Sequence, residues 1–139
     1  MSRLSHCQKV VAIAFFLLAV VPQFILIFWT VYPYDPLRID SINILSKVEV
    51  GQPFTYKLTG EKYTDLPGTI SRQFVNGLTI SMPAVSSNIN KGTKELISSF
   101  ILPYLPIGKY YLKWSATYDV NPIRSITVTG RSECFEIKK

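Results

Sequence analysis

The chain has very few of the residues that carry catalytic chemistry. Its 139 residues include one histidine, His6, and two cysteines, Cys7 and Cys134. Because no histidine follows His6, the rest of the chain cannot form Ser-His-Asp, Cys-His or histidine-metal arrangements. One cysteine near each end does not make the disulfide framework of a small secreted module. We therefore predict a protein that is not an enzyme, with no catalytic, cofactor-binding or metal-binding residues.

Loops that bind phosphate or calcium are also missing from the sequence. The 7 glycines stand singly, as turn residues do, and the aspartates lack the spacing of a calcium loop. Glu133 and Glu136 are close in sequence, but residues three apart on a strand point to opposite faces. Our preferred interpretation of these two residues is solvated charge on an edge strand. A hydrolase that uses them is the last of the functions we consider.

One long apolar run stands near the N-terminus. Residues 10–31 contain no charged side chain, and as a helix they would be about 33 Å long, against about 30 Å for the hydrocarbon core of a bilayer. Pro22 interrupts the run, but a proline-freed carbonyl in a membrane finds other partners, so we expect a mild kink. The run predicts one transmembrane helix over residues 10–31.

The charges around this run predict its orientation. Arg3, His6 and Lys9 precede it without an acidic residue. The first charged residue after it is Asp35. By the positive-inside rule, residues 1–9 stay in the cytoplasm and everything after Tyr32 is exported. A cleaved signal peptide is the alternative, but its apolar region usually has only about 7 to 15 residues, so we favour a retained single-pass anchor.

A proline-rich connector, residues 32–37, is expected to join this helix to a β domain of residues 38–139. The clearest strand signal lies in residues 108–120, where apolar and polar side chains alternate as in a strand with one buried face. This pattern places Trp114 in the core of the domain. Shorter alternating segments contain Ile42, Ile44, Val48 and Val50, and then Phe54, Tyr56 and Leu58.

The remaining strands are predicted from turns and from apolar content. Asn76 and Gly77 favour the positive φ angles of a type I′ hairpin turn. Residues 123–137 indicate one strand whose alternation changes phase, which predicts a bulge near Gly130. Residues 95–102 are apolar on both parities and indicate a strand covered on both faces or a short helix, of which we favour the strand. About seven or eight strands separated by turns predict an all-β immunoglobulin-like sandwich, preceded by one N-terminal transmembrane α-helix.

The domain resembles small membrane-anchored proteins that are encoded by bacteriophages and prophages and are mostly uncharacterised. The pieces that carry this resemblance are residues 63–67 (YTDLP), 71–77 (SRQFVNG), 105–110 (LPIGKY) and 121–124 (NPIR). The resemblance implies a phage product with an immunoglobulin-like domain that faces the periplasm or is exposed on a particle. It carries no established activity.

The chain is moderately basic, with 15 Lys and Arg against 9 Asp and Glu. Most lysines are scattered, but Lys109, Tyr111 and Lys113 share the outward parity of their strand. We interpret this strip as an edge that its lysines protect from pairing with other strands. Nucleic acid is therefore disfavoured as a partner, and contact with anionic lipid headgroups stays open.

Three residues in the resembling pieces, Tyr63, Arg72 and Arg124, are our candidates for binding a partner. The competing interpretation is that arginines near turns bond backbone carbonyls or pair with acidic residues. The missing catalytic groups and the anchor together favour a membrane-anchored, non-enzymatic interaction module, phage-encoded, that binds a protein partner at the cell envelope. The alternative is a structural component of a phage particle.

Overall fold

The computed structural model describes residues 5–138, which form two compact units. One unit contains the N-terminal helix, the residues up to Tyr34 and the turn Asn121–Arg124. The other unit contains Asp35–Val120 and the chain from Ser125 onward, and it includes nearly all of the β structure.

Helix α1 (His6–Val31) begins earlier than predicted and ends at the predicted residue. Its start is fixed by a capping box, in which the Ser5 Oγ accepts a hydrogen bond from the Gln8 N–H and the Gln8 side chain accepts one from the Ser5 N–H at 2.9 Å. The helix therefore takes in Lys9, which the sequence assigned to a cytoplasmic segment. Arg3, which contributed to the predicted orientation, lies outside the described residues.

The helix continues through Pro22, as the sequence predicted. Its 26 residues correspond to a length of about 39 Å. None of its side chains is buried, and its apolar residues are exposed on every face. The helix is thus long and apolar enough to span a membrane.

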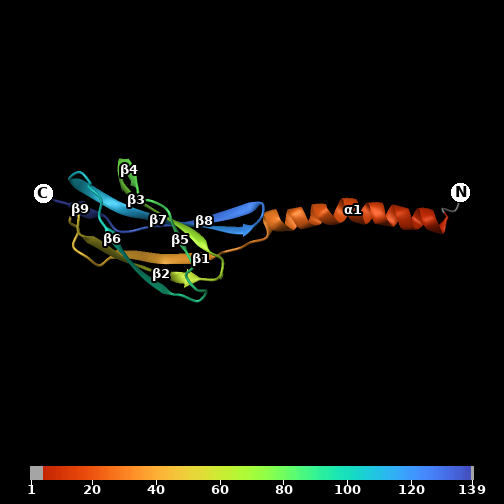
Figure 1. Ribbon diagram of the computed structural model, residues 1–139, viewed down its shortest axis with the longest axis horizontal. Coiled ribbons are helices and arrows are strands. Elements are labelled where there is room, and N and C mark those ends of the chain that lie inside the picture. Colours follow the sequence, from red (N-terminus) through yellow and green to blue (C-terminus); the bar gives the residue numbers. More distant parts are fainter. Residues whose placement is uncertain (1–4, 139) are drawn as a thin grey trace. The chain divides into compact units, whose positions relative to one another are not determined.

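The β domain consists of two sheets, drawn as two layers in Figure 1. The smaller sheet has the order β1 (Leu37–Ile44), β2 (Pro53–Lys62), β6 (Glu95–Ile101). The larger sheet has the order β4 (Leu78–Ser81), β3 (Gly68–Asn76), β7 (Gly108–Asn121), β8 (Arg124–Arg131), with β5 (Val85–Ser87) paired to β3 and β9 (Phe135–Ile137) paired to β7. Such an arrangement is compatible with a β-sandwich.

Inward side chains from both sheets form one core. The predicted alternation of β7 is confirmed, because the residues of one parity are buried from Tyr110 to Tyr118. Trp114 is 1% exposed, and its indole Nε1 donates a hydrogen bond of 3.2 Å to the hydroxyl of Tyr56 on β2. The rings of Phe54 and Phe74 meet edge to face at 5.6 Å across the two sheets. The core therefore ties the two sheets together.

The first strand differs from its prediction at both ends. β1 includes Leu37, which was assigned to the connector, and the predicted continuation through residues 48–50 is wrong. Leu37 and Ile42 are both buried although their parities differ. The reason is an irregularity in the pairing with β2 between Ile39 and Ser41, which shifts the inward parity by one residue.

The hairpin between β3 and β4 is confirmed, but its predicted turn type is wrong. Asn76 pairs directly with Leu78, so Gly77 alone connects the two strands. Gly77 has a φ of 66°, and among the described residues positive φ angles occur only at glycines. A type I′ turn requires a positive φ at Asn76 as well, and Asn76 does not have one.

The predicted strand over residues 123–137 is interrupted, and a three-residue break replaces the expected bulge near Gly130. Its two parts, β8 and β9, both pair with β7. Between them, the buried Ser132 donates its backbone N–H to the Leu112 carbonyl, and its Oγ accepts a hydrogen bond of 2.9 Å from the Leu112 N–H. The serine hydroxyl thus takes the place of a backbone carbonyl as the acceptor for the Leu112 N–H. The alternation of apolar and polar residues changes phase at this point.

Residues 95–101 form a strand, β6, and not a helix, as we favoured from the sequence. The expectation that both of its faces are covered is wrong for the described chain. Its inward residues, Leu96 and Phe100, are partly buried, but Ile97 and Ile101 are 62% and 60% exposed on the outer face. Among the described strands, β6 is also the last of its sheet, so one of its edges has no partner strand there.

Candidate functional site

The structure places the three predicted binding residues on different elements. Tyr63 follows β2, and its hydroxyl donates a hydrogen bond of 3.4 Å to the carboxylate of Glu61. Arg124 is the first residue of β8, and its Nη1 donates to the Tyr32 carbonyl at 2.5 Å. For Arg124 the competing interpretation, an arginine that bonds a backbone carbonyl, is therefore confirmed. Arg72 lies in the middle of β3, and its side chain bonds neither a backbone carbonyl nor an acidic residue of the described chain.

Arg72 occupies an inward position, between the buried residues Ile70 and Phe74 on the same face of β3. Its side chain is only 9% exposed, and its Nε is buried without a hydrogen-bond partner. The guanidinium lies 4.8 Å from the centroid of the Phe100 ring on β6, in cation–π geometry. Arg72 is thus a buried cation that contacts an aromatic ring of the other sheet.

The Arg72 side chain lines a groove of about 410 Å³. We call this the Arg72 groove; it lies between the free edge of β6 and the strands β3 and β5. It is lined by Tyr56, Ile70, Arg72, Val85, Ser86, Ser87, Ile89, Leu96, Ile97, Ser98, Ser99 and Phe100. Among these lining residues Arg72 carries the one charge, and four serine hydroxyls and several apolar side chains surround it. The groove can therefore accept an anionic group on an otherwise apolar ligand.

A second buried cation shows how this domain stabilises a structural charge. Lys62, 2% exposed, donates from its Nζ to the carbonyls of Leu66, at 2.9 Å, and Ile89. The same Nζ lies 5.6 Å from the centroid of the Tyr118 ring. Burial lowers the pKa of Lys62, and the nearby Asp65 partly opposes this effect. Lys62 is satisfied by groups of its own chain, whereas Arg72 is not.

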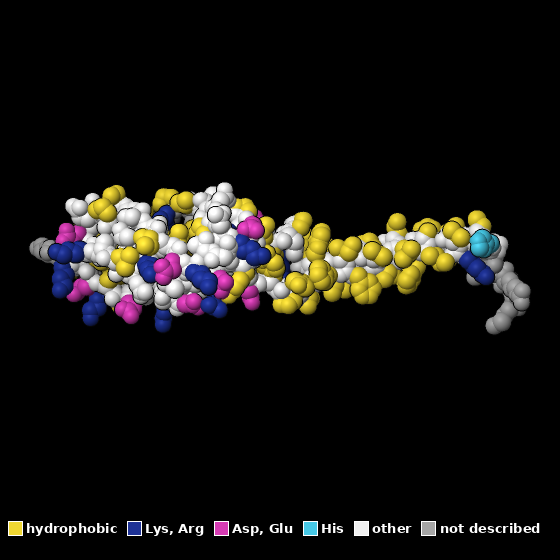
Figure 2. All heavy atoms as spheres, turned by 90° about the horizontal axis from the view of Figure 1, so that it is seen from below, with side chains coloured by type: hydrophobic (Ala, Val, Ile, Leu, Met, Phe, Trp, Pro, Cys, Tyr) yellow, Lys and Arg dark blue, Asp and Glu magenta, His cyan; other side chains and the backbone are white. Residues whose placement is uncertain are grey.

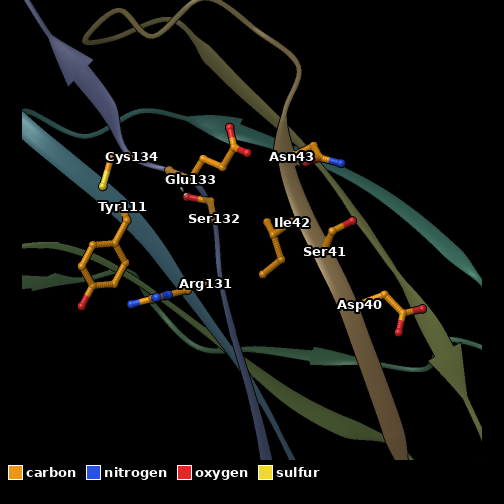
Figure 3. A pocket seen from close by; sticks show the side chains of 9 residues that line it. All are labelled: Asp40, Ser41, Ile42, Asn43, Tyr111, Arg131, Ser132, Glu133 and Cys134. Carbon is orange, nitrogen blue, oxygen red and sulfur yellow. Dashed lines mark hydrogen bonds between the residues drawn. The ribbon is translucent and has the colours of Figure 1, made fainter.

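A second groove, of about 440 Å³, separates β1 from the segment that joins β8 to β9. Figure 3 shows the residues that line it, with the Glu133 carboxylate and the Cys134 thiol pointing in different directions. Asp40 lines this groove and forms an ion pair of 3.0 Å with Arg38, which does not line it. Within the described chain, no group of three His, Cys, Asp or Glu residues is placed to hold a metal ion. Arg131 and Glu133, which also line this groove, are exposed to solvent, so the groove holds no buried charge and is the weaker candidate.

The two glutamates considered for a hydrolase lie at exposed positions. Glu133 precedes β9, whereas Glu136 lies on β9 opposite Lys109 and forms an ion pair of 3.5 Å with Lys138. Both side chains are therefore in contact with solvent, as the preferred interpretation of solvated charge holds.

The basic strip on β7 is exposed as predicted, but its interpretation as a protected edge is wrong. Lys109 and Lys113 are exposed and Tyr111 is partly exposed. β7 lies between β3 and β8 in the larger sheet, so it is not an edge strand. Figure 2 shows basic and acidic side chains interspersed on the visible face of the domain. A continuous basic surface, which nucleic acid requires, is not seen on that face.

The comparisons with known proteins do not assign a functional site, so the site is argued from the residues of this chain. Neither the protein-family models nor the curated proteins that we searched match this chain. The Arg72 groove is therefore the candidate site on the grounds of burial, charge and geometry. The sequence contained one signal for it, since Arg72 stands on the apolar parity of the segment from Ile70 to Phe74.

Proposed function

We propose that the protein is a membrane-anchored, non-enzymatic interaction module. In this proposal, α1 crosses the membrane once, and an immunoglobulin-like β domain outside the cytoplasm binds a protein partner at the cell envelope. The phage origin implied by the sequence resemblance is part of the same proposal. The cell compartment of the domain would then be the periplasm of a bacterial host.

The observation that carries the proposal is the exposure of α1. A helix that is apolar on every face requires an apolar environment, either a protein core or a lipid bilayer. No side chain of α1 is buried by the described chain, and the helix is long enough to span a bilayer. Trp29 and Tyr32 stand at its C-terminal end, where rings that are part polar and part apolar prefer the headgroup level. Lipid therefore accounts for this helix best.

The binding role is supported by features of the β domain. Within residues 5–138, the two edges of the smaller sheet, β1 and β6, have no further strand beside them, and a groove lies along each. The described residues include no metal cluster, and the grooves include no histidine. Recognition by surface complementarity fits these features better than chemistry does.

Proximity labelling tests the proposal directly. A labelling enzyme active outside the cytoplasm, fused to the C-terminus, should mark a defined set of envelope proteins in expressing cells. A matched chain that carries the Trp114→Ala substitution, and so a destabilised β domain, should lose this set while it keeps its membrane location. Labelling that is the same for both chains would contradict partner binding by the β domain. Recovery of the protein in purified phage particles, and not in cell membranes, would favour a structural component instead.

A further inference from the structure

We infer that the Arg72 groove binds a carboxylate carried by an extended peptide of the partner, which pairs with the free edge of β6. The inference rests on the proposed function, because it names the chemistry of the partner that the module binds. Three features carry it: a buried cation without a counter-charge, an open strand edge beside that cation, and apolar walls around it.

Arg72 has the properties of a receptor for an anion. A buried guanidinium is normally paired with a carboxylate or bonded to carbonyl oxygens, because its removal from water is costly. Its Nε has no hydrogen-bond partner, and none of the residues that line the groove is acidic. The Phe100 ring at 4.8 Å attracts the cation but cannot accept the directed hydrogen bonds that a carboxylate accepts. An incoming carboxylate would supply both the charge and the acceptors.

The comparison with Lys62 separates this role from a structural one. Lys62 is more deeply buried than Arg72, yet its Nζ donates to two backbone carbonyls of its own chain. The fold therefore satisfies one of its buried cations internally and leaves the other facing a groove. This difference is expected if the partner of Arg72 arrives with a ligand.

The edge of β6 indicates that the ligand is an extended peptide. β6 pairs with β2 on one side, and its other edge has no partner strand. Exposed edges are usually protected by lysine or proline, but β6 contains neither, and Ile97 and Ile101 are exposed on it. A peptide that adds to such an edge gains main-chain hydrogen bonds, and its side chains point alternately to the two faces. Every second side chain would then face the groove.

The walls of the groove predict the residues beside the acid. Ile70, Val85, Ile89 and Leu96 contribute apolar surface around Arg72. Because side chains of one face recur every second residue, apolar residues are expected two positions before and two positions after the acidic one. Serine hydroxyls of β5 and β6 also line the groove and can donate to the same carboxylate.

A peptide titration of the full chain in detergent micelles tests the inference. The probe is a capped, fluorescent seven-residue peptide with a central glutamate, valine two positions before and after it, and threonine at the other positions. Its partner probe has glutamine at the centre. The glutamate peptide should bind at least about tenfold more tightly, because hydrogen bonds between charged groups are stronger than neutral ones. Binding should also shift the NMR resonance of the Arg72 Nε–H, because the guanidinium gains an anionic neighbour.

Two substitutions of the same kind provide the controls. Arg72→Met should abolish the preference for glutamate, whereas Arg131→Met, which removes an exposed arginine from the other groove, should leave it unchanged. Arg72→Met should also raise the melting temperature of the free protein, since it removes a buried charge that has no partner. A structural role for Arg72 predicts a lower melting temperature instead.

Several outcomes would overturn the inference. These are equal binding of the two peptides, no binding of either at millimolar concentration, and a glutamate preference that survives Arg72→Met. Inorganic phosphate that shifts the Arg72 resonance as strongly as the peptide would indicate a simple anion site and contradict strand addition. None of these results affects the proposed function, which fails only if proximity labelling finds no partner that depends on the β domain.

Discussion

The hydrogen bond between Trp114 and Tyr56 offers the most quantitative test of the β domain. The two residues belong to opposite sheets, each is 1% exposed, and the indole Nε1 donates to the hydroxyl at 3.2 Å. Truncation of Trp114 to alanine should lower the free energy of unfolding by about 3 to 5 kcal/mol, through lost burial and the cavity left behind. A small domain has about 5 to 15 kcal/mol in total, so this loss removes a large part of its stability.

A double-mutant cycle isolates the hydrogen bond from the packing. Trp114→Phe leaves the buried Tyr56 hydroxyl without its donor, and Tyr56→Phe leaves the indole N–H without its acceptor, so each should cost about 1 to 3 kcal/mol. The double variant leaves neither group unpaired. Its cost should therefore be smaller than the two single costs added together, by about 1 kcal/mol or more.

Urea denaturation of the full chain in detergent, followed by circular dichroism and fluorescence, measures these values. Trp29→Phe serves as the background, so that Trp114 alone emits, and this substitution should not change the unfolding of the β domain. Trp114 should emit at short wavelength in the folded protein and shift to the red on unfolding. Water-exposed emission in the folded protein, together with an unchanged midpoint for Trp114→Ala, would refute the core assigned to β7.

Two further predictions concern buried polar groups. Burial lowers the pKa of Lys62 below its ordinary 10.5, so the unfolded chain holds the proton to a higher pH than the folded chain, and stability should rise as pH increases between the two pKa values. Denaturation at neutral and alkaline pH should show this rise in the parent and not in Lys62→Met; the same rise in both would contradict it. Ser132→Ala removes the acceptor of the Leu112 N–H and should lower the free energy of unfolding by about 1 to 3 kcal/mol, measured by urea denaturation, whereas Ser99→Ala, at an exposed hydroxyl, should have little effect.

The parts of the fold that were predictable from the sequence depend on long, regular patterns. The apolar run of α1 and the alternation of β7 each extend over many residues, so single exceptions do not obscure them. Shorter strands were placed less well, because a local event can shift their parity. The irregularity of β1 between Ile39 and Ser41 and the side-chain hydrogen bond of Ser132 are two such events. The second event appears in the apolar pattern only as the change of phase near Gly130, which does not show that the strand is interrupted.

The candidate site was predictable only in part. The sequence named Arg72 as a candidate together with Tyr63 and Arg124. Its inward parity between Ile70 and Phe74 was visible, but whether a buried arginine has a partner depends on distant segments. Here that partner would come from β5 or β6, and their lining residues carry no acidic group. Similarly, strand order cannot be read from alternation, which is why the lysines of β7 were assigned to an edge.

The two free cysteines provide the most direct test of the central claim, that α1 anchors a β domain outside the cytoplasm. Cys7 lies in the first turn of α1, Cys134 lies between β8 and β9, and both are exposed. A maleimide that cannot cross the inner membrane should label Cys134 in intact spheroplasts and leave Cys7 unmodified until the membrane is permeabilised. Cys7→Ser and Cys134→Ser assign each signal, and intact mass shows whether the helix is retained. Labelling of Cys7 with protection of Cys134, or loss of the N-terminal residues from the mature protein, would contradict the account.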